Sequence, residues 1–81
     1  MTLRADIIGK TVTAHVTRIE HYGLYLSHDD AEIIVLIPDV ANHPIRDLTN
    51  EFRLGDSVAV QVLRYIEEYK QYKGTMTGRE A

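Results

Sequence analysis

The sequence VTRIEHYGLYL, residues 16–26, decides the predicted fold, because it holds the end of one β-strand and most of a second. The first strand extends upstream, where apolar and polar residues alternate with a period of two, as in a half-buried strand. Ile19 breaks this alternation, which indicates a β-bulge near Arg18. Gly23 opens the second strand, in which leucines alternate with Tyr25. The leucines are therefore expected to face the core and Tyr25 the solvent.

Three more strands are expected downstream. They occupy residues 33–37, 57–66 and 71–77. A polar turn at residues 28–32 precedes the third strand, and Pro38 closes it because proline cannot donate to a ladder. Residues 39–53 lack a sustained period and read as a long connection with a turn or two of helix. The fifth strand is the weakest, since Gly74 interrupts it.

Five short strands with a long connection between the third and fourth predict a closed barrel, because closure removes exposed strand edges. The expected fold is all-β: a small five-stranded Greek-key barrel, or OB-fold, with a short helical turn between strands 3 and 4. One domain is expected over residues 1–81, with its core at about 9–77, since so short a chain encloses one core. The predicted inward residues are Val12, Val16, Leu24, Leu26, Val35, Ile37, Val58, Val60 and Val62.

Composition limits the classes of function. Hydrophobic residues make up 44% and charged residues 26% of the 81 residues, which favours a folded domain over a disordered chain. The apolar run 33–37 is too short to cross a membrane, and the N-terminus lacks a signal-peptide pattern, so the chain is expected to stay in the cytoplasm. The net charge is −3, with acidic residues concentrated in 20–56, which argues against nucleic-acid binding by bulk charge alone.

Motifs for catalysis or metal binding are not found in the sequence. There is no cysteine, and the four histidines lack the spacing of a zinc site. Asp29 and Asp30 are not part of a calcium-loop pattern, and no nucleophile motif or phosphate loop occurs. A barrel of this size is also filled by its own side chains. We therefore expect no enzyme, no metal and no cofactor.

Three segments, taken in order, resemble the S1 family of RNA-binding domains, which are OB-folds. Residues 16–26 resemble the passage from the family's first strand to its second. Residues 34–40 resemble its third strand and the start of the connection, and residues 52–58 its entry to the fourth strand. The match runs from about Gly9 to Thr77, nearly the whole chain.

The resemblance implies an RNA-binding face on the second and third strands. It places two aromatics at Tyr22 and Tyr25 and a fifth-strand cation at Lys73. The family's third-strand histidine is Leu36 here. Further departures from the family pattern occur at Ile33, Pro38 and Gly74.

The residues themselves favour the same face. Exposed tyrosines are stacking platforms for unpaired bases, although a tyrosine also commonly covers a barrel end without any ligand. Cations that could reach a backbone phosphate, each also consistent with a plain surface charge, are Lys10, Arg18, Arg64, Lys70 and Lys73. His15 and His21 lie beside this face, with a plain polar role as the alternative. The tyrosines at 65, 69 and 72 are explained by cross-strand packing.

Two functions remain open at this point. The first is a module that recognises single-stranded RNA through an aromatic and basic barrel face, in translation or RNA metabolism, with the ribosome or a ribonucleoprotein as a partner. The alternative is a protein-interaction module of the same fold that has lost RNA affinity and binds a partner through its acidic surface. Leu36 and the net acidity favour the alternative, whereas Tyr22, Tyr25 and Lys73 favour RNA.

Overall fold

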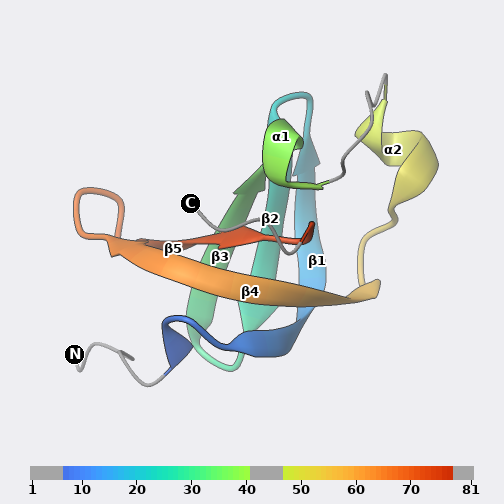
Figure 1. The fold of residues 1–81 in the computed structure, drawn as a ribbon. Coiled ribbons are helices and arrows are strands. Elements are labelled where there is room, and N and C mark those ends of the chain that lie inside the picture. The colour runs from blue at the N-terminus through green and yellow to red at the C-terminus, as the bar shows by residue number, and fades with distance from the viewer. Residues whose placement is uncertain (1–6, 41–46, 78–81) are drawn as a thin grey trace.

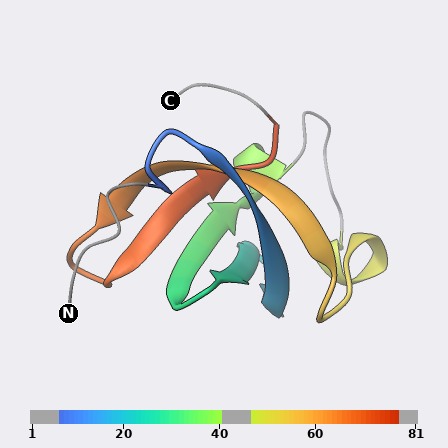
Figure 2. The same cartoon turned by 90° about the horizontal axis from the view of Figure 1, so that it is seen from below.

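Five β-strands and two short helices form the part of the chain that the computed structural model describes, residues 7–40 and 47–77. The elements are β1 Thr11–Glu20, β2 Gly23–His28, β3 Ala31–Leu36, α1 Ile37–Val40, α2 Leu48–Glu51, β4 Ser57–Ile66 and β5 Gln71–Thr75. The strands close into a barrel in the order β1-β2-β3-β5-β4 (Figures 1 and 2). Strands β3 and β5 pair in parallel, and the other neighbours are antiparallel. The predicted Greek-key barrel, with short helices between its third and fourth strands, is confirmed.

Two β-bulges change which side chains face outward. The register shifts between Val16 and Arg18 in β1, and between Val62 and Arg64 in β4. Both valines are buried, so uninterrupted alternation would point both arginines into the core. The extra residue in each strand instead turns the arginines onto the outer surface, where both are exposed. The sequence indicated the bulge near Arg18 but not the one before Arg64.

The core is built from the inward residues of all five strands. Of the predicted core residues, only Val12, Ile37 and Val58 are half-buried, and these still pack against the buried cluster. The cluster also contains residues that were not among the predicted core residues, namely Ile7, Ala14, Ala31, Ile33, Val40, Leu48 and Tyr72. Tyr72 is buried because its ring packs edge-on against Tyr65 across the final hairpin, with centroids 5.0 Å apart. The expected cross-strand packing of these tyrosines is confirmed, while Tyr69 is exposed.

The predicted bounds of the third strand were wrong by one or two residues at each end. The strand starts at Ala31 because this residue is buried, and the turn before it shortens to Asp29 and Asp30. Ile37 begins α1 instead of ending the strand. Pro38 fits there, because the first turn of a helix does not use its backbone N–H groups. Part of the predicted connection, residues 41–46, lies outside the described residues.

Gly74 does not interrupt β5, contrary to the prediction, although the strand ends at Thr75 and not at Thr77. The glycine is buried in the barrel interior. A Cβ atom at this position would lie 2.6 Å from Val60 Cγ2 and 2.9 Å from Ile33 Cγ2. The two aliphatic side chains therefore fill the space that a larger residue in β5 would occupy.

Candidate nucleic-acid interface

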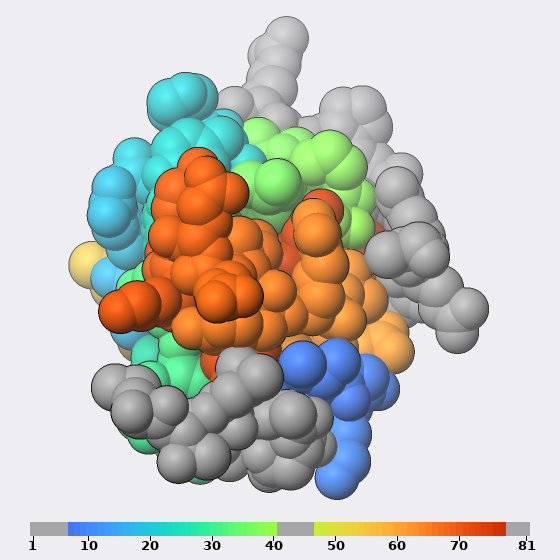
Figure 3. Space-filling model, turned by 90° about the vertical axis from the view of Figure 1, so that its left-hand side faces the viewer, coloured from blue at the N-terminus to red at the C-terminus, as the bar shows by residue number. Residues whose placement is uncertain are grey.

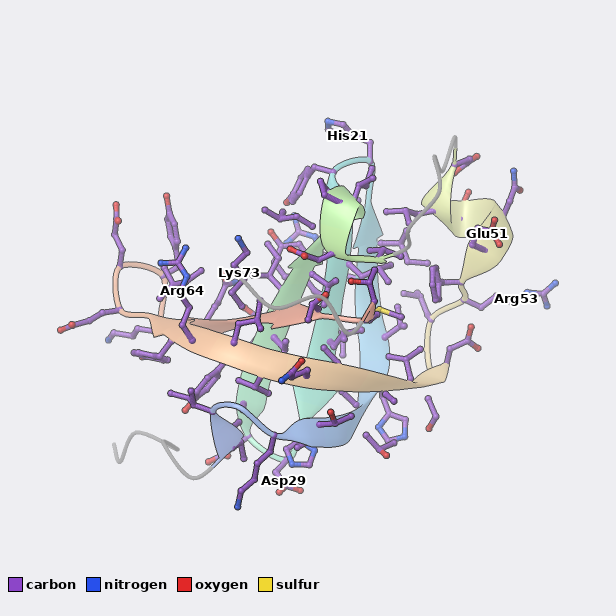
Figure 4. The ribbon with its side chains drawn as sticks, in the orientation of Figure 1. His21, Asp29, Glu51, Arg53, Arg64 and Lys73 are labelled. Carbon is purple, nitrogen blue, oxygen red and sulfur yellow. The ribbon has the colours of Figure 1, made fainter. Side chains whose placement is uncertain are left out.

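A row of outward side chains crosses the barrel. The strand register pairs Arg18 with Tyr25, Tyr25 with Ile34, Ile34 with Lys73, and Lys73 with Arg64. Paired residues on neighbouring strands point to the same side of a sheet, so these five side chains share one face. With strands about 4.8 Å apart, the row covers roughly 19 Å of curved surface. Lys73 and Arg64 project to the same side of the β4–β5 ribbon in Figure 4.

The β1–β2 turn adds an aromatic cluster next to Tyr25. The Tyr22 and Tyr25 hydroxyl oxygens are hydrogen-bonded at 2.6 Å, and the two rings meet edge to face with centroids 6.2 Å apart. The His21 ring in turn lies edge-on to the Tyr22 ring, with centroids 5.3 Å apart. The hydrogen bond with Tyr22, followed by burial, raises the pKa of the Tyr25 hydroxyl above its ordinary value. Tyr25 therefore stays neutral at physiological pH, and the hydrogen bond fixes its ring relative to that of Tyr22.

Arg18 covers the Tyr25 ring. Its guanidinium carbon lies 4.8 Å from the ring centroid, and its Nε donates a hydrogen bond to the Glu20 carboxylate. This bond, and the charge of Glu20, raise the pKa of Arg18 further above its usual value. The guanidinium is thus held over the Tyr25 ring. Sequence reasoning treated Arg18 only as a candidate phosphate contact, and it missed the stacking and the role of Glu20.

Gly23 positions the two tyrosines. A Cβ atom here would lie 2.4 Å from the Val35 carbonyl oxygen and 3.0 Å from Leu36 Cα. This close backbone approach is what a glycine at a strand start indicates. It brings β2 directly against the end of β3, where Ile37 N–H donates to the Tyr22 carbonyl at 3.0 Å.

Aliphatic side chains occupy the centre of the face. Ile34 and Leu36 are both half-buried on β3, between the tyrosines of the β1–β2 side and Lys73 of β5. Leu36 pairs with Gly23, so the family's histidine position lies beside the aromatic cluster. The surface is therefore apolar in the middle and cationic at both ends.

The other predicted site residues lie around this row. His15 is exposed and pairs with Ser27, which is the next outward position after Tyr25 in β2. Lys70 is exposed in the β4–β5 turn, outside the strand register. Figure 3 shows the orange β4–β5 hairpin and the cyan β1–β2 region on one face of the molecule. The structure thus places Tyr22, His21, Tyr25, Lys73 and Arg64 on or next to the row, His15 at its border, and Lys70 beyond its end.

Within residues 7–40 and 47–77, no three side chains of the metal-ligating types come together. In the same ranges, no helix is long and apolar enough to cross a membrane.

A closed five-stranded barrel with aromatic and cationic side chains on one outer face defines a nucleic-acid-binding module. The chain belongs to the S1 RNA binding domain family, whose model matches residues 6–73. The predicted family is therefore confirmed. The fold of this family is a binding fold and not a catalytic one.

Solved structures show the same fold. A chain in the crystal structure of an a/eIF2alpha-aDim2p-rRNA complex from Pyrococcus horikoshii OT3 is 25% identical, with a TM-score of 0.76, over 86% of this chain and 44% of that one. GSP13 from Bacillus subtilis is 26% identical, with a TM-score of 0.75, over 85% of this chain and 54% of that one. The intact alpha subunit of aIF2 from Pyrococcus abyssi is 25% identical, with a TM-score of 0.75, over 86% of this chain and 28% of that one. This chain spans less than two thirds of the length of each. No curated protein sequence matches it.

Proposed function

We propose that this module binds single-stranded RNA across the row Arg18–Tyr25–Ile34–Lys73–Arg64, in translation or RNA turnover. Tyr22 and the layer of Arg18 on Tyr25 stack with bases, while Lys73 and Arg64 contact backbone phosphates. The family supports RNA as the ligand, and the structural neighbour in a complex with rRNA supports a ribosomal or ribonucleoprotein partner.

The observation that carries this proposal is the strand register, which brings an aromatic cluster and two cations onto one continuous face. Stacking on an aromatic ring contributes about 1–3 kcal/mol per base and accepts any base. Arg guanidinium planes also stack with unpaired bases. A strand that stacks at one end of the row reaches the cations at the other end, so both kinds of contact act on the same ligand.

The geometry favours a single strand over a duplex. Bases in a duplex are stacked on one another and present only their edges, so they cannot lie flat on a protein ring. The exposed ring of Tyr22, which is 36% accessible, offers such a surface.

The acidic residues of α2 do not oppose this binding mode. Glu51 lies on the side of the barrel away from Lys73 and Arg64, as Figure 4 shows. Apart from Glu20, which is paired with Arg18, the side chains of the row itself are apolar, aromatic or cationic, despite the net charge of −3.

A titration with fluorescein-labelled oligouridine at low salt tests the proposal. Replacing both Tyr22 and Tyr25 by Leu keeps the apolar packing and removes the rings, so we expect affinity to fall by about tenfold or more. Tyr69→Leu is the matched control, because Tyr69 is exposed in the β4–β5 turn, and it is expected to bind as the parent does. A labelled duplex is expected to bind more weakly than the single strand. Unchanged binding by the double variant, with its thermal unfolding also unchanged, would refute the proposed face.

A further inference from the structure

Glu20 is an acidic side chain in direct contact with the proposed RNA-binding row. Its Oε2 accepts the hydrogen bond from Arg18 Nε, and the Arg18 guanidinium lies on the Tyr25 ring. The side chains of Arg18 and Glu20 are 60% and 29% exposed, so both are accessible to a ligand. A negative charge therefore lies beside the aromatic cluster, where phosphates of a bound strand would pass.

The hydrogen bond uses only part of the donor capacity of Arg18. A guanidinium has five N–H donors, and Nε–H accounts for one, so the two terminal nitrogens keep four for another acceptor. Geometry thus leaves Arg18 able to contact a phosphate, but its charge is balanced locally by the carboxylate. A phosphate that binds Arg18 is therefore either repelled by the nearby carboxylate or must displace Glu20 from the ion pair.

We propose that Glu20 lowers the RNA affinity of this module by neutralising Arg18. The inference rests on the proposed function, since it takes the row as the RNA-binding face. With Glu20 paired, Arg18 contributes its flat stacking surface but little net charge, so it does not count as a full phosphate contact. Without the carboxylate, the same guanidinium attracts phosphate and releases a counterion on binding.

A purely structural role for the pair predicts something different. Exposed ion pairs contribute little to folding stability, so loss of this pair is expected to leave the barrel unchanged. If Glu20 served mainly to orient Arg18 for RNA, its neutralisation would weaken binding. If it only adds to the total negative charge, any exposed carboxylate would have the same effect when neutralised.

The experiment compares Glu20→Gln with Glu51→Gln, using labelled oligouridine over a range of salt concentrations. Both variants remove one negative charge, but Glu51 lies in α2, on the side of the barrel away from Lys73 and Arg64, and no contact described for it reaches Arg18. We expect Glu20→Gln to tighten binding by roughly three- to tenfold at low salt and to steepen the log–log salt slope by about 0.7, the value for one added phosphate contact on a single strand. Glu51→Gln is expected to tighten binding by about twofold at most, because distant exposed charges are screened.

A double-mutant cycle with Arg18→Gln shows whether Glu20 acts through Arg18. In the Arg18→Gln background, Glu20→Gln is expected to have no more effect than Glu51→Gln. Equal effects of the two glutamate variants in the parent, or weaker binding by Glu20→Gln, would overturn the inference while leaving the RNA-binding face in place. A parent that binds no oligouridine at low salt would overturn the proposed function itself, and this inference with it.

Discussion

Gly74 is the glycine whose missing side chain is replaced by two core side chains of the barrel interior. A Cβ there would come within 2.6 Å of a Val60 methyl group and 2.9 Å of an Ile33 methyl group. Val60 and Ile33 are themselves fully buried, so neither can move outward to make room. The volume of residue 74 is therefore coupled to the volume of residue 60.

This coupling predicts a non-additive pair of substitutions. Val60→Ala alone is expected to lower the free energy of unfolding by about 1–3 kcal/mol through lost contacts and a cavity. Gly74→Ala alone is expected to cost about 1–3 kcal/mol through overpacking. In the Val60→Ala background, Gly74→Ala is expected to cost clearly less, because the nearest clashing methyl is gone. Urea unfolding of the four proteins measures the cycle.

The exposed residue Thr11 supplies the control for this cycle, since Thr11→Ala lies in a strand but outside the core. Losses that add up for Val60→Ala and Gly74→Ala would contradict the contact seen between the two positions. A loss for Val60→Ala no larger than for Thr11→Ala would contradict the predicted inward phase of β4.

Sequence reasoning could not decide how Gly74 acts, because a glycine in a strand pattern either weakens the strand or permits a close approach. The choice depends on Val60 and Ile33, which are distant in sequence and come together only when the barrel closes. Gly23 carried a similar ambiguity, between a close backbone approach and an unusual φ, and the Val35 carbonyl oxygen beside it decides for the close approach. Glu20 was missed for a related reason, because its contact with Arg18 depends on the bulge that turns both residues outward.

At the scale of elements, the β2–β3 pair holds the aromatic end of the row. Gly23 lies against the Val35 carbonyl, and Ile37 N–H donates to the Tyr22 carbonyl. These backbone contacts tie the β1–β2 turn to the end of β3. The positions of Tyr22 and Tyr25 thus depend on this junction as well as on their own strands.

Gly23→Ala is expected to open the junction. The added Cβ meets a backbone oxygen at 2.4 Å, which a rotamer change cannot relieve, so the expected loss of unfolding free energy is about 2–3 kcal/mol. Amide hydrogen exchange is expected to accelerate at Ile37, whose bond to Tyr22 spans the junction. Ser27→Ala, in the same strand, is the control and is expected to change neither quantity appreciably. Parent-like stability and exchange for Gly23→Ala would show that β2 and β3 are farther apart than described.

The approximate positions of all five strands could be predicted from apolar alternation and, for the third strand, from its apolar run. The predicted bounds of β4 were right, whereas those of β3 and the end of β5 were not. The first residue of β3 is Ala31, whose burial follows from tertiary contacts and could not be expected from its short side chain. Ile37 continues the apolar run of β3 and so reads as strand. The structure instead places it at the start of α1. The second bulge, before Arg64, could not be predicted, because apolar residues occur on both faces of β4 there and no break in the alternation marks it.

At the scale of the whole molecule, a net charge of −3 is compatible with a cationic row, because the strand register gathers Lys73 and Arg64 at neighbouring positions of one face. The net charge alone would predict repulsion of RNA. The row provides Lys73 and Arg64 within one continuous face, with Arg18 paired to Glu20 at the other end. Affinity for RNA is therefore expected to depend on a few local contacts and not on the overall field.

The salt dependence of binding tests this view of the molecule. Each phosphate contact with a single strand contributes about −0.7 to the slope of log affinity against log salt, so two or three contacts predict a slope of about −1.4 to −2.1 for the parent. Lys73→Ala is expected to weaken binding and to reduce the magnitude of the slope by about 0.7. Lys70→Ala removes the same charge from the β4–β5 turn, beyond the end of the row, and is expected to change the slope much less. Equal changes in the two lysine variants would show that RNA responds to a diffuse positive surface around the hairpin, whereas a difference between them ties the phosphate path to the register of β3, β5 and β4.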